Sequence, residues 1–217
     1  MTRSLLAEFL GTMWLVMTGI GTGIMAISLS PDATALALFV NSFATGLALY
    51  VLITVFAPIS GAHLNPAVTF YMMLTGQTPL NRAGMYWVAQ IAGALCAVPL
   101  THAMFGEALV QIATTDRSAA RLWLSEGIAT FGLLMVIVGG LRTGGAQVPA
   151  LVGAWVAAAF WFTGSSIFGN PAVTIARMFS DSFTGIRPVD APGYVLAELV
   201  AALLAWLVLP RLFGRNL

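Results

Sequence analysis

The chain contains the pentapeptide Asn-Pro-Ala-Val-Thr twice, at residues 65–69 and 170–174. Each copy ends a loop rich in glycine and serine, inside a sequence that is otherwise almost continuously apolar. Asn followed by Pro is a favoured start of a helix, because Asn can cap the helix and Pro fits its first turn. Two identical motifs at matching places indicate an internally duplicated membrane protein with one paired site, where the two Asn amides can donate hydrogen bonds to a passing neutral oxygen atom.

Other polar residues accompany both motifs. Glu8 and Glu126 lie one turn inside long apolar segments, where an ionisable side chain is costly and usually functional. Because the two occupy equivalent places in the halves of the chain, we expect each to hold the loop before a motif by accepting hydrogen bonds, in preference to relaying protons. His63 is expected to support the first of these loops, and His102 to lie at the membrane interface.

The composition is that of a membrane protein. Of 217 residues, 59% are hydrophobic and 8% are charged, with a mean hydropathy of +0.92, whereas soluble domains carry roughly 25% charged residues. A net charge of +1 offers no clustered positive face for nucleic acid. The first apolar run is interpreted as a retained span and not as a signal peptide. Cys96 is expected to be a buried small apolar residue. Because it is the single cysteine, the sequence excludes a disulfide or a zinc framework.

Apolar segments of two lengths follow one another along the chain. The segments over 66–76 and 171–180 begin at the prolines of the two motifs and cover only about half of a bilayer at about 1.5 Å per residue. They are predicted to be half-helices that re-enter the membrane. Six further segments are long enough to cross it, at residues 5–29, 34–57, 82–104, 121–141, 146–163 and 192–212.

The predicted fold is therefore an all-α membrane protein with a single domain over 1–217, built from repeats of about 1–110 and 118–217. Because each repeat has an odd number of spans, the second is inverted, so the half-helices enter from opposite faces and meet at the midplane. Their positive N-terminal ends then repel cations. The distribution of arginine puts both termini in the cytoplasm. The arginines assigned to the cytoplasmic side are Arg3, Arg82, Arg142, Arg211 and Arg215, against Arg117, Arg121 and Arg187.

The chain resembles the aquaporin or major intrinsic protein family over essentially its whole length. The resemblance rests on the six spans, on Ser-Gly-Ala-His-Leu-Asn-Pro-Ala-Val over residues 60–68, on the second Asn-Pro-Ala and on the paired glutamates. It implies an aquaporin-like fold, a right-handed bundle with a pore in each subunit, a homotetramer, and a channel without enzymatic activity, catalytic residues, metal or cofactor. The pore motifs that it implies are Asn65, Pro66, Ala67, Asn170, Pro171 and Ala172.

The sequence departs from the family at the narrow filter. Val173 stands where an arginine usually follows the second Asn-Pro-Ala, and Thr45 stands where water-selective members carry an aromatic residue. The filter position on the fifth span is either Val156 or Ala158, depending on how the loop before the second motif is aligned. The wall supplied by that loop is expected to consist of Ser166, Ile167 and Phe168.

A widened filter without the usual arginine predicts passage of small uncharged polar solutes. These include glycerol-like solutes, neutral metalloid acids such as arsenious acid, and water. Together with residues 170–177, the filter is similar to that of bacterial aquaglyceroporin-like channels found with arsenic-resistance genes, which implies a multi-pass protein of the bacterial inner membrane. Arg177, one turn beyond Val173, either turns toward the extracellular mouth and partly replaces the missing charge, or pairs with Asp181 or a loop carbonyl.

Three other functions compete with this prediction. One is a water-selective aquaporin. A second is an ion-coupled secondary transporter, because inverted repeats and broken helices also mark that class, although coupling usually needs titratable groups near the midplane. A third is an intramembrane hydrolase, with Ser165 or Ser166 as nucleophile and His63 or His102 as base. Apart from Glu8 and Glu126, the spans offer almost no titratable groups, which disfavours the transporter. A hydrolase would leave the duplication unexplained, and the chain has no Gly-x-Ser-x-Gly motif.

Overall fold

A computed structural model describes residues 2–214, so Met1 and residues 215–217, including Arg215 of the charge count, lie outside the described residues. Over the described residues the chain is all-helical, which confirms the predicted fold class. The helices are α1 (Arg3–Leu29), α2 (Thr34–Ser60), α3 (Pro66–Leu74), α4 (Leu80–Phe105), α5 (Ala120–Arg142), α6 (Val148–Phe162), α7 (Pro171–Arg177) and α8 (Ala191–Phe213).

Five of these helices (α1, α2, α4, α5 and α8) are long and apolar enough to cross a membrane. Helix α6 has 15 residues and is therefore only about 22 Å long at about 1.5 Å per residue. The span predicted over 146–163 was too long at both ends. Gly144 and Gly145 form a turn with positive φ before α6, and Thr163 ends it in an extended conformation.

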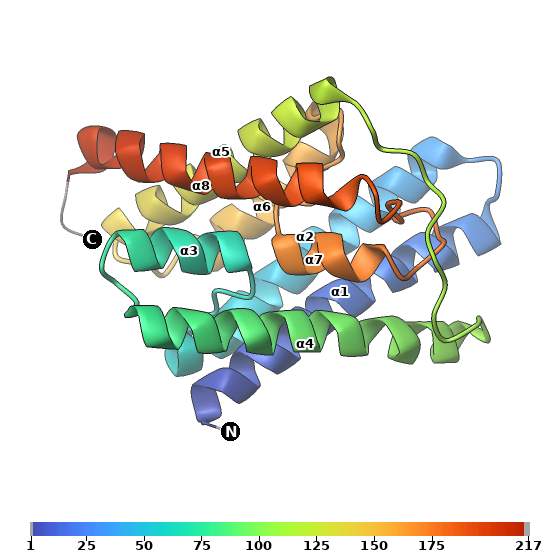
Figure 1. Ribbon diagram of the computed structural model, residues 1–217, viewed down its shortest axis with the longest axis horizontal. Helices are drawn as coiled ribbons and strands as arrows, with labels where there is room; N and C mark the ends of the chain where they lie inside the picture. The colour runs from blue at the N-terminus through green and yellow to red at the C-terminus, as the bar shows by residue number, and fades with distance from the viewer. Residues whose placement is uncertain (1, 215–217) are drawn as a thin grey trace.

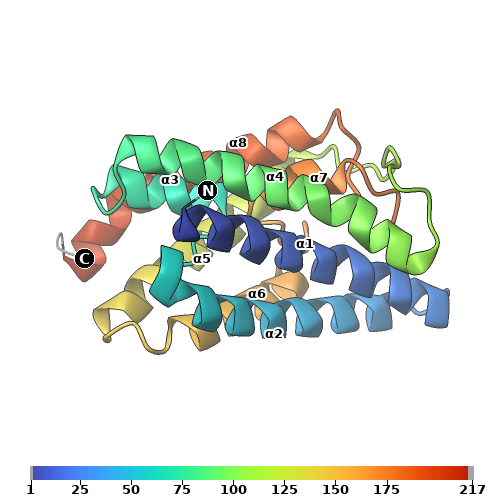
Figure 2. The same ribbon diagram turned by 90° about the horizontal axis from the view of Figure 1, so that it is seen from below.

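The two half-helices α3 and α7 lie along a common line in the interior, between α4 and α8 (Figure 1). Each contacts a long helix of the other repeat, α3 against α8 and α7 against α4, and they also contact one another. The beginning of α1 and the end of α8 lie toward the same end of the bundle (Figures 1 and 2). The half-helices are thereby held at the junction of the two repeats.

Small residues allow the long helices to approach closely. A Cβ atom added at Gly93 of α4 would lie 2.2 Å from the Phe9 carbonyl oxygen of α1. A Cβ atom added at Gly153 of α6 would lie 2.5 Å from the Gly46 carbonyl oxygen of α2. Such contacts replace the hydrophobic driving force that is missing between helices in lipid.

Cys96 is exposed on α4, and the prediction that it is buried was wrong. Its neighbour Leu95 is exposed as well, as is Val88 two turns earlier on the same helix. An apolar side chain on a membrane-spanning bundle is stable against lipid and does not need burial inside the protein.

Candidate pore and filter

The two Asn-Pro motifs have nearly the same backbone conformation. Asn65 has φ −159° and ψ 120°, and Asn170 has φ −160° and ψ 110°. The Oδ1 atom of Asn65 accepts a hydrogen bond from the N–H of Ala67 at 2.8 Å, and that of Asn170 accepts one from Ala172 at 3.0 Å. Each Asn is therefore the N-cap of its half-helix, as the sequence predicted.

The amide nitrogens of the same two residues connect the repeats. Nδ2 of Asn65 donates to the Gly169 carbonyl oxygen at 2.7 Å, and Nδ2 of Asn170 donates to the Leu64 carbonyl oxygen at 2.8 Å. Both Asn residues line the central cavity. Because an amide nitrogen carries two hydrogen atoms, each Asn keeps one N–H for an acceptor in that cavity.

Glu8 holds the first re-entrant loop with both of its carboxylate oxygens. Oε1 accepts from Ser60 Oγ at 2.6 Å and from the His63 N–H at 2.9 Å. Oε2 accepts from the Leu64 N–H and from Gln90 Nε2, each at 2.7 Å. These are the hydrogen bonds expected of Glu8 from the sequence, and they satisfy backbone donors that would otherwise be unpaired at membrane depth.

In the second loop the same task is divided between two carboxylates. Glu126 accepts from the N–H of Phe168 at 2.9 Å and of Gly169 at 2.8 Å, as expected. Glu198 accepts from the next N–H, that of Asn170, at 3.0 Å. Sequence reasoning assigned no role to Glu198, although its match to Gln90 between the repeats was the signal that could have identified it.

His63 lines the cavity and also supports its own loop. Its Nδ1 atom lies 3.0 Å from Oγ1 of Thr69, and its ring packs edge-on against Tyr86 with centroids 5.3 Å apart. The ring is thereby fixed on two sides.

His102 is fully buried, which corrects the expectation of an interfacial residue. Its Nε2 atom lies 2.9 Å from Ser180 Oγ, and its Nδ1 atom lies 2.8 Å from the Ala108 carbonyl oxygen, because the segments after α4 and after α7 fold over the end of α4. Within the described chain, neither Ser165 nor Ser166 hydrogen-bonds to a histidine. The serine–histidine pair that a hydrolase would need is therefore not formed. Ser166, which was expected in the wall of the pore, does not line the cavity.

Four of the residues predicted to form the filter line the cavity. Thr45, Val156, Ile167 and Val173 line it, whereas Ala158 is exposed on the outside of α6. Of the two alternatives for the fifth span, Val156 is therefore the one that faces the cavity, since a residue two positions further along a helix points to another side. The Thr45 hydroxyl oxygen is enclosed and has no hydrogen-bond partner among the described residues.

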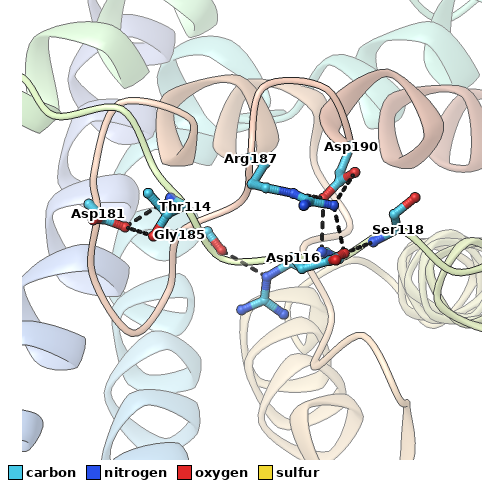
Figure 3. Close-up of polar contacts among 8 residues, drawn as sticks. Thr114, Asp116, Ser118, Asp181, Gly185, Arg187 and Asp190 are labelled. Carbon is cyan, nitrogen blue, oxygen red and sulfur yellow. Dashed lines mark hydrogen bonds and ion pairs between the residues drawn. The ribbon is translucent and has the colours of Figure 1, made fainter.

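Arg177 also lines the cavity and is 5% exposed. Its guanidinium carbon lies 4.3 Å from the centroid of the Phe168 ring, and that of Arg117 lies 5.1 Å from the same ring. Cation–π contacts of this kind contribute about 0.5 to 2 kcal/mol. Asp181, the partner considered for Arg177, instead accepts from the N–H and the hydroxyl of Thr114, both at 2.9 Å (Figure 3).

A network of charged residues ties the loop between α4 and α5 to the segment before α8 (Figure 3). Arg187 pairs with Asp116 at 2.8 Å and with Asp190 at 3.0 Å. Burial raises the pKa of the Asp190 carboxyl, but hydrogen bonds from Arg187 and from the Arg117 N–H outweigh this effect, so the net pKa lies below the ordinary value of 3.8. Asp190 therefore stays ionised at neutral pH and holds Arg117 beside the mouth of the cavity.

Residues 1–169 match the family described as major intrinsic protein. The chain belongs to this family. It is 46% identical to "Aquaglyceroporin AqpS" of Rhizobium meliloti (strain 1021) over 215 residues, which cover 97% of this chain and 92% of the relative. It is 36% identical to "Aquaporin TIP1-2" of Musa acuminata over 185 residues, covering 79% and 73% of the two chains.

The fold has a counterpart among solved structures of the family. The X-ray structure of the aquaglyceroporin from Plasmodium falciparum superposes with a TM-score of 0.74 and 22% sequence identity, over 98% of this chain and 95% of that one. As a major intrinsic protein with several membrane-spanning helices, the chain is a multi-pass membrane protein.

Proposed function

We propose that the chain is a passive channel for small uncharged polar solutes, which include glycerol-like polyols, neutral metalloid acids such as arsenious acid, and water. The observation that carries the proposal is one cavity that runs from Leu141 and Val148, past Asn65 and Asn170, to Arg177. A 46% identical relative named an aquaglyceroporin supports the same class of solute.

The chemistry of the cavity wall suits neutral solutes. The two Asn residues each have an N–H available to a solute oxygen, and most of the remaining wall is apolar. No Asp or Glu is among the described residues that line it. Glu8 and Glu126 instead bond to the loops, so the two carboxylates that could couple transport to an ion do not line the cavity.

The proposed filter consists of Thr45, Val156, Ile167 and Val173. A valine in place of an arginine removes both bulk and a hydrogen-bond donor, and Thr45 is smaller than the aromatic residue of water-selective members. Pore diameter and the donors lining a pore set the selectivity of such channels. We therefore expect the pore to admit solutes of the size of glycerol in addition to water.

A single stopped-flow experiment tests this function. Proteoliposomes are exposed to a sudden hyperosmotic glycerol step, and light scattering follows shrinkage as water leaves and re-swelling as glycerol enters. Re-swelling much faster than in empty vesicles is expected, and arsenious acid is then tested in the same way. Fast shrinkage without re-swelling would mean a water-selective pore, and no acceleration of either phase would contradict a channel.

A variant sharpens the filter assignment. Val173→Arg restores the side chain usual in the family and is expected to lower glycerol permeability by about tenfold or more, with a smaller effect on water. Equal glycerol permeability in Val173→Arg and the unchanged protein would show that residue 173 is not part of the narrowest point.

Assembly and orientation extend the proposal. By family analogy we expect a homotetramer in a bacterial inner membrane, with both termini in the cytoplasm. Light scattering coupled to size exclusion in detergent measures the assembly. Accessibility of single cysteines introduced at residues 4 and 189, in a Cys96→Ala background, measures which end of the bundle faces the cytoplasm.

A further inference from the structure

The side chain of Arg177 has hydrogen-bond donors without an acceptor. Only 5% of the residue is exposed, and none of the described residues accepts a hydrogen bond from its guanidinium group. Arg177 lines the cavity, and its nitrogens are not among the fully enclosed polar atoms of the described residues. A guanidinium has five N–H donors, and leaving such donors unpaired in a protected place is costly. The acceptor must therefore be something that enters the cavity.

The surroundings fix the position of this group. The Phe168 ring lies 4.3 Å below the guanidinium carbon. On another side, a Cβ atom added at Gly19 would lie 3.2 Å from Nη2, so the group rests against bare backbone of α1. The Gly19 carbonyl oxygen accepts a hydrogen bond from Asn41 Nδ2 of α2 at 2.7 Å, which holds this part of α1 against α2. The guanidinium is thus held between the Phe168 ring and the backbone of α1, in a side chain that lines the cavity.

We propose that Arg177 is the specificity-determining residue at the end of the pore beside the α4–α5 loop, a proposal that rests on the channel function proposed above. It lies one helical turn beyond Val173, and residues four apart share a face of a helix. Its planar fork presents parallel N–H donors that match two neighbouring oxygens. The solutes that it selects are neutral molecules with two adjacent oxygens, such as vicinal diols and neutral oxyacids.

The same residue excludes cations. Arg117 lies on the Phe168 ring as well, at 5.1 Å, and its Nε atom donates to the Gly185 carbonyl oxygen at 2.8 Å. Two positive charges thus stand at this end of the cavity, whose described lining contains no carboxylate. Positive charge at one end of a pore is an electrostatic barrier to cations and protons.

Three variants separate the charge of Arg177 from its shape. Arg177→Met keeps the length of the side chain and removes charge and donors. Arg177→Lys keeps the charge and removes the planar fork. Arg82→Met is the matched control, because Arg82 is exposed near the start of α4 and does not line the cavity. Proteoliposomes report glycerol and urea permeability by light scattering, and proton flux by an enclosed pH-sensitive dye under a potassium diffusion potential.

We expect Arg177→Met to raise proton flux by about tenfold or more and to lower the ratio of glycerol to urea permeability. Urea has a single oxygen and is the comparison solute for that reason. Arg177→Lys is expected to keep the low proton flux but to lose the glycerol preference. Arg82→Met is expected to match the unchanged protein in both measurements.

The outcomes separate this inference from the channel function. If the unchanged protein conducts glycerol and Arg177→Met keeps its proton flux and its solute ratio, the role of Arg177 is overturned and the channel function stands. If the unchanged protein conducts neither solute, both are overturned. Should Arg177→Met fail to insert, Gly19→Ala provides the second variant, since its Cβ atom pushes against Nη2 without a change of charge. It must then lower the glycerol preference, and an unchanged ratio contradicts the proposal.

Discussion

The two half-helices have the same start but different ends. Val68 of α3 and Val173 of α7 occupy equivalent places three residues after Asn65 and Asn170, and both line the cavity. Seven residues after the Asn, however, α3 has the uncharged Met72, whereas α7 has Arg177. The duplication thus preserves the centre of the pore, where both repeats contribute the same groups, and permits its two ends to differ in charge.

The supports behind the half-helices differ in a second way. In the first repeat Gln90 donates to Glu8, and the same carboxylate accepts from the His63 and Leu64 N–H groups of the loop. In the second repeat the equivalent residue is Glu198, which accepts from the loop beside Glu126. One repeat therefore has an acid and an amide, and the other has two acids. Substitutions at Glu8, Gln90 and Glu198 test how much the stability of the protein depends on each arrangement.

Glu8→Ala is expected to have the largest effect. The substitution leaves the His63 and Leu64 N–H groups and the Ser60 hydroxyl without their acceptor in a buried loop. Each buried unsatisfied donor costs about 1 to 3 kcal/mol, so the first re-entrant loop should no longer form. Fluorescence-detected size exclusion in detergent measures the loss as a lower yield of monodisperse protein.

Glu107→Ala is the matched control, because Glu107 is an exposed glutamate of the α4–α5 loop. We expect it to give the same yield and the same elution profile as the unchanged protein. A Glu8→Ala protein that elutes as a single sharp peak and melts at the same temperature would contradict the role given to the carboxylate.

Gly93→Ala is expected to have the next largest effect. Its Cβ atom would lie 2.2 Å from the Phe9 carbonyl oxygen, so α1 and α4 must move apart. Overpacking of this kind costs about 1 to 3 kcal/mol. The equivalent crossing in the second repeat has its glycine on α5, and a Cβ atom at Gly127 would lie 4.0 Å from the Ala197 carbonyl oxygen, an ordinary contact.

The comparison of these two glycines is made by thermal unfolding in detergent. Gly93→Ala should lower the melting temperature clearly, whereas Gly127→Ala should leave it nearly unchanged. Equal melting temperatures for the two variants would mean that the α1–α4 crossing can relax, and that the two repeats are less different in packing than the distances indicate.

The centre of the pore was predictable from the sequence because it is duplicated. An Asn-Pro pair at matching places specifies a helix cap and the start of a half-helix locally, because the Ala67 N–H donates to the side-chain oxygen of Asn65 and the Ala172 N–H donates to that of Asn170. The position of Glu8 one turn inside a span indicated a loop partner, since a buried carboxylate needs donors. These signals depend on nearby residues and on the repeat alone.

The ends of the pore were not predictable in the same way. The direction of the Arg177 side chain depends on Phe168 and Gly19, which are brought to it by the tertiary structure. The choice between Val156 and Ala158 depends on the length of a loop that departs from the usual pattern. The length of α6 and the exposure of Cys96 depend on where turns fall and on which side of a helix faces lipid.

Exchanging Gln90 and Glu198, the residues that support the two loops, is expected to have an effect no larger than that of Gly93→Ala. The two exchanges should change stability in opposite directions. Glu198→Gln gives the second repeat the arrangement of the first, because the new amide can donate to Glu126 while its oxygen still accepts from Asn170. It also removes the unpaired Oε2 atom of Glu198. Gln90→Glu places a second carboxylate beside Glu8 and removes a donor to it.

We expect Glu198→Gln to keep or raise the melting temperature in detergent, and Gln90→Glu to lower the free energy of unfolding by about 1 to 3 kcal/mol, the cost of a lost partner for a buried group. Both changes replace an amide by an acid or the reverse at nearly constant volume, so packing is matched between them. If Glu198→Gln is the more damaging of the two, the second acid is a required part of the second loop. The pair of Glu8 and Gln90 and the pair of Glu126 and Glu198 would then hold their loops in different ways, and one pair could not replace the other.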